Sequence, residues 1–458
     1  MTIAQAITEL TQVLGDRLTT SKSDLDLHGQ SEAYFPPTPP DAVAYPRSTE
    51  EVSQIMRICS AHDCPVVAWG TGTSLEGHAL AINGGICVDF TKMDKILRVS
   101  PEDMDCTVQP GVTREALNTD LRATGLFFPV DPGANASLGG MTSTRASGTT
   151  AVRYGTMRDN VMGLEVVLAD GRVIRTGTRA RKSSSGYDLT ALFTGAEGTL
   201  GLITEITLRL RGQPEAISAA VCAFDSTEDA VNAVITTIQM GIPMARIEFL
   251  DKASAAVCKA QSGIELAEAP HLLVEFHGSE TSTAEDATRF GEVAEEFGGT
   301  DFRWSSKPEE RSALWEMRHR AYWSTLAAHP GCTGVTTDAC VPISQLARAI
   351  EDARKLIDDS PVPGYILGHV GDGNYHSLLI IDPNKPEDKA AAKALAKRMS
   401  EQALELQGTI TGEHGIGMGK LPLMAEQHGD AWSVMGDLKR TLDPQNILNP
   451  GKVVQQNG

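Results

Sequence analysis

The 43 glycines of this 458-residue chain are unevenly spread, and many of them lie in five clusters, an arrangement that limits what the chain can fold into. The clusters lie at residues 70–85, 133–155, 195–201, 368–373 and 412–419. Apolar, often β-branched runs lie beside them at 65–68, 85–89, 164–169 and 202–210, and amphipathic stretches lie at 50–61 and 114–124. Glycine permits tight turns and close backbone approach to a ligand. We therefore predict short strands joined by glycine-rich turns, with helices covering them, up to Gly212.

After Gly212 the composition changes. Predicted strands at 219–223 and 272–276 alternate with predicted helices at 227–240 and 283–297. That pattern is typical of a second, α+β domain. From Gly408 the glycines return, and the chain ends in an NPGK motif at 449–452. We expect an N-terminal helical segment (1–36), two domains (37–213 and 214–410) and a C-terminal segment (411–458) that returns to the first domain.

Charge and composition exclude several classes of protein. Asp and Glu number 59 against 40 Lys and Arg, a formal net charge of −19. A field of that sign repels phosphate backbones, so we expect no nucleic-acid partner. Hydrophobic residues make up 41%, which is ordinary for a globular protein and not for a disordered or coiled-coil one.

The cysteines and the N-terminus indicate location. None of the eight cysteines is spaced Cys-x-x-Cys, so we expect reduced, mostly buried thiols and no cysteine-based metal site. Residues 1–16 lack a basic start and a long apolar core, and are predicted to form a helix instead of a signal peptide. No run approaches the roughly 18 apolar residues that a membrane helix needs. We predict a cytoplasmic protein without an integral membrane segment, peripheral to a membrane or mitochondrial if a targeting segment has been removed.

The first chemical signal is a predicted strand that ends in Gly70-Thr71-Gly72-Thr73-Ser74. Glycines there let several N–H groups converge on one anion, and the hydroxyls add donors, so a pyrophosphate would fit. The Rossmann spacing is missing, and so is the lysine of a P-loop. An ordinary turn is the alternative.

Two further glycine-rich segments follow. Residues 127–160 combine five glycines with many Ser and Thr, which suggests close approach to a large flat ligand; a loosely structured loop is the alternative. At 192–210 a glycine-rich turn runs directly into a β-branched strand.

Together these three segments resemble the FAD-binding domain of the vanillyl-alcohol oxidase / p-cresol methylhydroxylase flavoprotein family. Within it the chain is similar to FAD-linked D-lactate dehydrogenases of the cytochrome type, from about residue 37 to 454. Glycolate oxidase flavin subunits and D-2-hydroxyglutarate dehydrogenases are close by. The resemblance implies an α+β fold with a two-part FAD-binding domain and a substrate or cap domain built on an antiparallel sheet. It implies that FAD contacts Gly70, Thr71, Gly72, Thr73, Ser74, Pro132, Gly133, Gly140, Thr144, Ser147, Gly148, Glu197, Ile203 and Asn449.

A candidate metal site lies in GYILGHVGDGNYHSLLIID, residues 364–382. Asp372-Gly373 between two apolar runs predicts a hairpin tip, and counting outward sets His369 opposite His376. Residues opposite each other share a face, so two imidazoles could bind one metal ion. Two histidines that only decorate a hairpin are the alternative.

A third ligand is offered by Glu413, and a base by its neighbour His414. If the chain is extended there, the two side chains point to opposite sides. A His₂Glu set with an open position is a catalytic arrangement. A surface Glu–His pair is the alternative, but the resemblance implies that His369, His376 and Glu413 bind a divalent ion and that His414 is the catalytic base. Zn²⁺ is expected first, and Mn²⁺ or Fe²⁺ would suit the same ligands.

The segment 313–323 predicts one helix with Trp315, Arg318 and Tyr322 on one face. An arginine can bind a carboxylate bidentately, and Trp315 and Tyr322 would exclude water from the pocket around it. Tyr322 and Trp323 are expected to contact the substrate together with Arg318. A surface arginine over core aromatics is the alternative. The resemblance implies that Arg318 holds the C1 carboxylate of the substrate.

Two positions at which this chain differs from the D-2-hydroxyglutarate dehydrogenases indicate the kind of substrate. The 2-hydroxyglutarate enzymes have Lys where Thr336 stands and Asn where Leu378 stands. Without those groups a second buried carboxylate would be costly, which favours D-lactate or another small, apolar D-2-hydroxy acid.

The resulting hypothesis is a D-2-hydroxy-acid dehydrogenase in which His414 takes the hydroxyl proton and hydride passes to flavin N5. The reduced flavin would pass its electrons to a cytochrome, an electron-transfer flavoprotein or a quinone. Alternatives are a glycolate oxidase-type flavin subunit active only in a hetero-oligomer, a D-2-hydroxyglutarate dehydrogenase, and a non-redox metallohydrolase.

Overall fold

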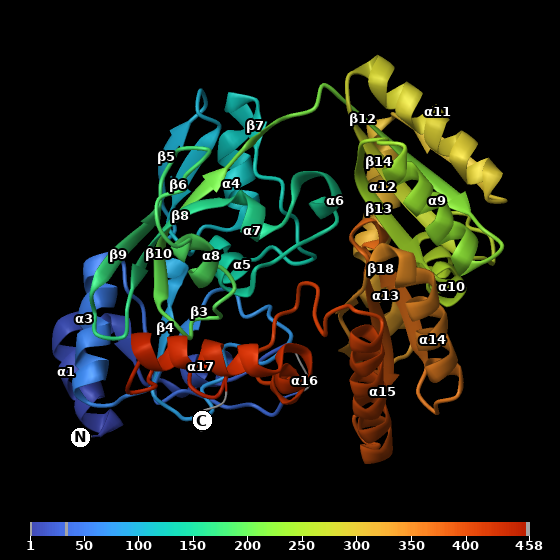
Figure 1. Ribbon diagram of the computed structural model, residues 1–458. Coiled ribbons are helices and arrows are strands. Elements are labelled where there is room, and N and C mark those ends of the chain that lie inside the picture. The colour runs from blue at the N-terminus through green and yellow to red at the C-terminus, as the bar shows by residue number, and fades with distance from the viewer. Residues whose placement is uncertain (1, 33–34, 455–458) are drawn as a thin grey trace. The chain divides into compact units, whose positions relative to one another are not determined.

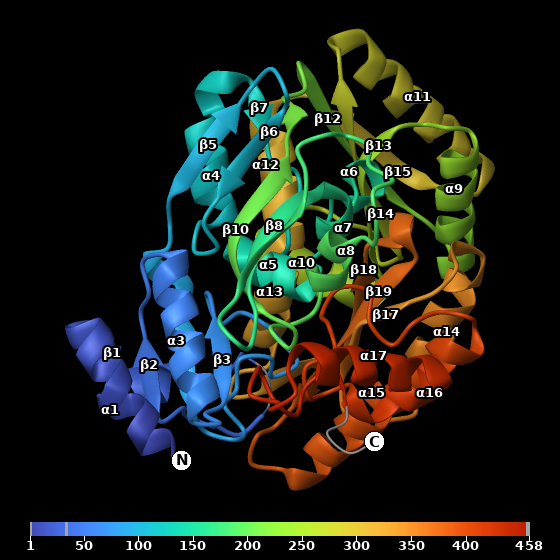
Figure 2. The same cartoon turned by 60° about the vertical axis from the view of Figure 1, so that its left-hand side comes forward.

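The computed structural model describes residues 2–32 and 35–454, and the chain forms two compact units (Figures 1 and 2). Unit 1 consists of Met1–Ser147, Gly155–Gln213 and Glu413–Gly458, and unit 2 of Gly148–Tyr154 and Pro214–Gly412. Both units combine helices with largely antiparallel sheets, so the predicted α+β class is confirmed. Among the described residues, no helix is long and apolar enough to cross a bilayer.

The first sheet of unit 1 carries the first glycine signal. Its strand order is β1 (Leu18–Thr19), β2 (Ala42–Ala44), β4 (Ile86–Asp89), β3 (Val66–Trp69), and β4 is parallel to both β2 and β3. Helices α1 (Ile3–Leu14) and α3 (Thr49–Ala61) pack together beside it. Ser48 caps α3, and the helix buries an apolar face that includes Val52 and Ile55. The glycine-rich loop therefore starts at the carboxyl end of a parallel strand, where α/β sheets bind ligands.

The second sheet of unit 1 is antiparallel, in the order β5-β6-β10-β8-β9. Its strands are β5 (Ile96–Ser100), β6 (Asp105–Val108), β8 (Val161–Val167), β9 (Val173–Gly177) and β10 (Leu202–Arg209). The accompanying helices are α4 (Arg114–Leu121), α5 (Leu138–Thr144), α7 (Met157–Asn160) and α8 (Leu189–Phe193), with α2 (Lys22–His28) beside β2. A small ribbon pairs β7 (Leu126–Phe127) with β11 (Arg211–Gly212).

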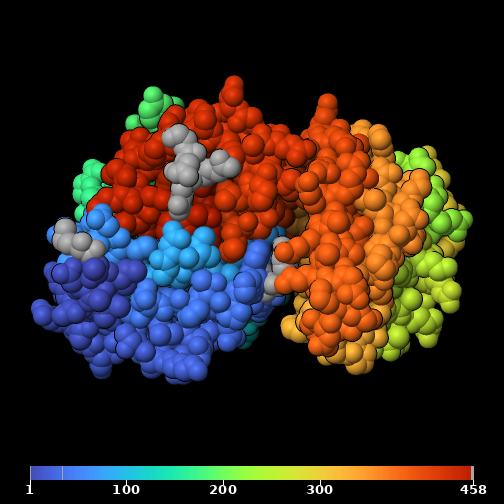
Figure 3. All heavy atoms as spheres, turned by 90° about the horizontal axis from the view of Figure 1, so that it is seen from below, coloured from blue at the N-terminus to red at the C-terminus, as the bar shows by residue number. Residues whose placement is uncertain are grey.

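The C-terminal segment is part of unit 1. It carries α16 (Met424–His428) and α17 (Asp430–Leu442), and its end runs beside β3, where the N–H of Asn449 donates to the carbonyl of Val66 at 2.8 Å. Figure 3 shows the red atoms of this segment against the blue atoms of the N-terminal residues. The predicted return of the C-terminal segment thus brings the NPGK motif to the first glycine loop.

Unit 2 is built on one large sheet in the order β15-β12-β14-β13-β18-β19-β16, with β17 also paired to β19. The strands are β12 (Ala216–Ala223), β13 (Met244–Leu250), β14 (His271–Gly278), β15 (Thr300–Ser305), β16 (Thr333–Thr336), β17 (Ala339–Cys340), β18 (Gly364–Gly368) and β19 (Asn374–Ile381). All of its pairs are antiparallel, as predicted.

Helices cover both faces of this sheet. On one side lie α10 (Lys252–Ser262), α12 (Pro308–His319) and α13 (Ala321–Ala328), and on the other α9 (Thr227–Gln239), α11 (Glu280–Glu296) and α14 (Leu346–Asp358) (Figure 2). Helix α15 (Pro386–Glu405) packs on β19, and the short α6 (Ala151–Tyr154) packs on β13. The centre of the sheet, where β13, β18 and β19 meet, is therefore shielded from water.

All eight cysteines are free thiols, and six of them are buried. Burial raises the pKa of Cys258 to about 11. Such thiols stay protonated and inert at neutral pH, which agrees with the predicted reduced state.

Candidate functional site

The hairpin that carries the two histidines differs in register from the prediction. His376 pairs with Leu367, not with His369, and His369 instead begins a short 3-10 turn that spans Val370–Asp372. A two-residue tip at Asp372-Gly373 was wrong because only Gly373 has a positive φ, +76°, whereas a type I′ turn needs two such residues. The loop is longer than predicted, and His369 stands at its base.

The two imidazoles nevertheless come together. Their ring centroids are 5.3 Å apart and their planes lie at 81°. The Nδ1 of His369 lies 2.6 Å from a carboxylate oxygen of Glu248, and that of His376 lies 3.2 Å from the carbonyl of Thr337. Both partners are acceptors, so in a neutral imidazole they favour the proton on Nδ1 and the lone pair on Nε2. This is the tautomer that a metal ligand needs, and it fits the predicted ion.

The chain places Glu413 near these rings. The carboxylate of Asp338, 1% exposed, accepts from Asn374 Nδ2 at 2.7 Å, from the Thr411 hydroxyl at 2.6 Å and from the Gly412 N–H at 2.8 Å. Glu413 follows Gly412 directly, so these hydrogen bonds fix the position of the backbone from which the Glu413 side chain extends. One ligand atom each from His369, His376 and Glu413 lie within 4.8 Å of one another, close enough to bind one ion. His414 follows directly in the chain.

Arg318 is buried and partly unsatisfied. Its Nη2 donates to Glu248 at 2.5 Å, and the residue is 7% exposed. Its Nε is buried and has no hydrogen-bond partner among the residues that the structure describes. A buried guanidinium with unused donors is suited to bind an anion, which a surface arginine over core aromatics is not.

The single helix predicted around Arg318 was wrong, because it breaks at Arg320 into α12 and α13. Trp315 is buried, whereas Trp323 is 63% exposed and packs edge-on against Tyr322 at 5.1 Å. A side chain so exposed does little to exclude water from a pocket. The part of Trp323 in substrate binding stays a prediction, without support from its burial.

The three glycine-rich segments converge within unit 1. A Cβ on Gly70 would collide with the hydroxyl of Ser137, the residue that caps α5, on which Gly140 and Thr144 lie. The Glu197 N–H donates to the carbonyl of Ser143 at 2.8 Å, which joins the third segment to the second. The glycine clusters thus let segments of the chain approach one another closely, and their close approach to a bound ligand stays a prediction.

The other predicted FAD contacts are distributed around this junction. Gly70–Ser74 leave the end of β3, Pro132 and Gly133 lie between β7 and α5, Ser147 and Gly148 follow α5, and Ile203 is buried in β10. Gly148 is the first residue of the short segment assigned to unit 2. The individual FAD contacts stay predictions.

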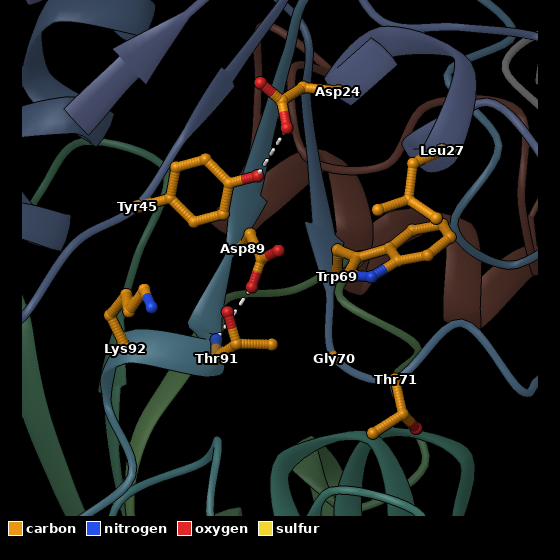
Figure 4. A pocket seen from close by; sticks show the side chains of 9 residues that line it. All are labelled: Asp24, Leu27, Tyr45, Trp69, Gly70, Thr71, Asp89, Thr91 and Lys92. Carbon is orange, nitrogen blue, oxygen red and sulfur yellow. Dashed lines mark hydrogen bonds between the residues drawn. The ribbon is translucent and has the colours of Figure 1, made fainter. Parts of the chain in front are cut away.

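A hollow of about 640 Å³ adjoins the first glycine loop (Figure 4). Gly70 and Thr71 line it together with Trp69, Asp24 and Asp89, at the carboxyl ends of β3 and β4. Tyr45 donates to Asp24 at 3.4 Å and the Thr91 N–H donates to Asp89 at 2.7 Å. Lys92 also lines the hollow, so two carboxylates and one ammonium group lie around it, and binding of a pyrophosphate by the N–H groups of the glycine loop stays the prediction.

Glu197 and Asn449 hold loops together. The Glu197 carboxylate accepts the N–H groups of Ile416 at 2.7 Å and Gly417 at 2.8 Å, and His78 lies 3.2 Å away. Asn449 Nδ2 donates to the carbonyls of His78 and Glu197. Burial raises the pKa of Glu197, but the charge of His78 and the two N–H groups outweigh it, so the pKa lies below its ordinary value. Glu197 therefore anchors the loop that follows His414.

We expect Glu197→Gln to lower the stability of unit 1 at pH 7, since a neutral amide leaves a buried N–H poorly paired, at a cost of about 2 kcal/mol. A carboxylate with a lowered folded-state pKa stabilises above its unfolded pKa, and that stability is lost as pH falls through the folded value. The difference from wild type should therefore shrink below about pH 4.5. Thermal unfolding across pH 3.5–7 measures it.

Glu205→Gln is the matched control, because Glu205 is only half-buried and pairs with the exposed Arg175 at 3.1 Å. We expect Glu205→Gln to lower the free energy of unfolding by less than about 1 kcal/mol. Equal losses in both variants, or a loss in Glu197→Gln that does not change with pH, would contradict the anchoring role.

Comparison with known proteins agrees with this geometry. A family model described as FAD binding domain matches residues 40–177, and one described as FAD linked oxidases, C-terminal domain, matches residues 213–453. The chain belongs to the FAD-linked oxidase family. The confirmed α+β architecture of this FAD-linked oxidase is thus the one that the glycine-rich segments implied.

Individual relatives extend the match over nearly the whole chain. A probable mitochondrial D-lactate dehydrogenase of Danio rerio is 46% identical over 99% of this chain and 92% of its own length. The mitochondrial D-lactate dehydrogenase [cytochrome] of Arabidopsis thaliana is 44% identical over 98% of this chain and 80% of its own. The crystal structure of substrate-bound p-cresol methylhydroxylase superposes with a TM-score of 0.78 at 17% identity, covering 99% and 97% of the two chains. At that identity the superposition establishes the fold of this oxidase and nothing finer.

Proposed function

We propose that this chain is an FAD-dependent dehydrogenase that oxidises D-lactate, or another small D-2-hydroxy acid, to the 2-keto acid. The observation that carries the proposal is the junction in unit 2 where the buried Arg318 and His369 meet on one carboxylate, Glu248, with the ring of His376 5.3 Å from that of His369. An anion anchor beside a Lewis-acid site is what a 2-hydroxy acid requires, since its carboxylate and hydroxyl lie on adjacent carbons. The D-lactate dehydrogenases that match nearly all of the chain support the same substrate.

Each side chain has a defined task. Arg318 binds the C1 carboxylate through its unused donors and orients the substrate. His369, His376 and Glu413 would hold a divalent ion, Zn²⁺ first, which when bound supplies a Lewis acid that lowers the pKa of the substrate hydroxyl. His414 accepts the hydroxyl proton as general base. The Gly70–Ser74 loop and the start of α5 would hold FAD, which when bound would supply the acceptor for the hydride from C2.

The substrate end beyond C2 should be small and apolar. Thr336 and Leu378 are direct partners across β16 and β19, so their side chains share one face of the sheet. Neither offers a charge to a second carboxylate, and burying one without a partner costs several kcal/mol. The Tyr322 ring lies close over Gly334, since a Cβ there would be 3.2 Å from the ring. The ring therefore leaves less room for a substrate on the same face. We therefore propose D-lactate over a dicarboxylate.

An anaerobic visible spectrum tests the reaction. We expect D-lactate to bleach the bound flavin, and L-lactate and D-2-hydroxyglutarate to do so at least about 100-fold more slowly. The opposite configuration at C2 of L-lactate, or the second carboxylate of D-2-hydroxyglutarate, would leave polar groups unpaired. Metal analysis of the same sample, and of one stripped with a chelator, tests the divalent ion. Purified protein without flavin would overturn the proposal and favour a hydrolase. A yellow protein that no D-2-hydroxy acid reduces would point to a subunit of a larger assembly.

The electron acceptor is proposed to be of the cytochrome type, as the name of the Arabidopsis relative specifies for that protein. Reoxidation of the D-lactate-reduced protein by ferricytochrome c, followed by stopped flow against a quinone and an electron-transfer flavoprotein, distinguishes the acceptors.

A further inference from the structure

Glu248 joins two groups that the proposed reaction uses separately. It lies in β13 and is fully buried, with a side-chain exposure of 0%. One carboxylate oxygen accepts from His369 Nδ1 at 2.6 Å, and the other accepts from Arg318 Nη2 at 2.5 Å. All three residues belong to unit 2, and they come from β13, α12 and the histidine loop.

A buried carboxylate is stable only when charged or hydrogen-bonded partners compensate its lost hydration. Here each carboxylate oxygen accepts one of the two hydrogen bonds. As an acceptor for Nδ1, Glu248 favours the tautomer of His369 that has its proton on Nδ1 and its lone pair on Nε2. By holding Nη2, it also fixes the plane of the Arg318 guanidinium and leaves Nε available.

Resting on the proposed function, we infer that Glu248 is a positioning residue that sets the metal ligand His369 and the substrate anchor Arg318 in one fixed relation. A 2-hydroxy acid spans those two groups with its adjacent carboxylate and hydroxyl, so their spacing selects for that substrate class. Glu248 itself touches neither the substrate nor the ion. Its removal should therefore weaken ion binding and substrate binding together.

Glu248→Gln is the direct test, since the amide keeps the shape but can accept from only one of the two partners. The other partner then faces an N–H₂ group. We expect Zn²⁺ affinity of flavin-loaded, metal-stripped protein, measured by competition with a chelator, to fall about 10- to 100-fold. With Zn²⁺ saturating, KM for D-lactate should rise at least about 10-fold while kcat falls less. Glu248→Asp should restore part of both losses, because it keeps the charge.

The chain offers a matched control in the neighbouring strand β14. Glu275 is 4% exposed, accepts from His277 at 2.7 Å and lies 3.5 Å from Arg246. Like Glu248, it is therefore a buried carboxylate beside one histidine and one arginine. Glu275→Gln should cost similar stability and leave Zn²⁺ affinity and KM within about twofold, since neither partner has a part in the proposed reaction. Unchanged Zn²⁺ affinity in Glu248→Gln, unchanged KM, or equal effects of both variants would overturn the inference.

Failure of the proposed function is distinguishable. If wild-type protein bound no Zn²⁺ and D-lactate left the flavin oxidised, the proposed function would fall. The positioning role of Glu248 would then be tested by the tautomer of the His369 imidazole. That tautomer is measured from ¹⁵N spectra of histidine-labelled protein, with the His369 signals assigned by the His369→Gln variant. We expect wild type to show Nδ1–H and Glu248→Gln to lose that preference. The same tautomer in both proteins would refute the positioning role.

Discussion

Replacing Arg318 by Met should lower kcat/KM for D-lactate by about 10²- to 10⁴-fold, because each charge-assisted hydrogen bond to a carboxylate contributes about 1.5–3 kcal/mol. The loss has two sources. The substrate loses its anchor, and Glu248 loses the partner of one buried oxygen. Stopped-flow reduction of the flavin by D-lactate under anaerobic conditions measures the effect. The flavin itself should remain bound, since Arg318 lies in unit 2 and all the predicted FAD contacts except Gly148 lie in unit 1.

Two variants sharpen the test. Arg318→Lys keeps the charge but not the planar fork, so it should recover only part of the rate. Arg320→Met is the matched control: Arg320 lies two residues further on, its side chain is 69% exposed, and its ion pair with Glu316 measures 3.5 Å. That change should leave kcat/KM within about twofold. Similar losses in Arg318→Met and Arg320→Met would show that the helix, and not a carboxylate contact, is what matters.

Local sequence signals predicted several elements of unit 1. The β-branched runs at 85–89 and 202–210 form β4 and β10, and the amphipathic stretch at 50–61 forms α3. Those segments succeed because hydrophobic period and caps lie within one short stretch of chain. The prediction of a single helix at 313–323 was wrong because Arg320 lies between the end of α12 and the start of α13, and no local sequence signal marks that break.

The histidine hairpin shows where local reasoning ends. Asp372-Gly373 is a correct turn signal, but the turn that forms uses only Gly373 in the left-handed region, so the loop takes in His369 and the register shifts. The imidazoles still meet, because His369 reaches across from the base of the loop to Glu248, 121 residues earlier in the sequence. Long-range hydrogen bonds of this kind have no local sequence signature.

Glu248 and Asp338 were missed for the same reason. Each is a carboxylate that holds a proposed ligand or its loop, and each contacts residues more than 30 positions away. One signal was available for Glu248: it stands between Ile247 and Phe249 in an apolar strand, and an acidic residue buried there must have a partner. The identity of that partner depends on the order of the strands, which the sequence does not give.

Replacing His414 by Ala should slow flavin reduction by D-lactate about 10²- to 10⁴-fold, the usual contribution of a general base. Arg318 and the three proposed ligands remain, so D-lactate and Zn²⁺ should bind within a few-fold of wild type, and the oxidised flavin spectrum should be unchanged. Added imidazole should restore part of the rate, because a diffusible base can occupy the space of the deleted ring. His62→Ala is the control, since His62 ends α3 and pairs with Glu9 at 2.8 Å in unit 1. If His414→Ala reduced its flavin at the wild-type rate, or lost Zn²⁺ affinity as severely as Glu413→Gln, His414 would not be the base, and the proton would have to leave the hydroxyl by another route.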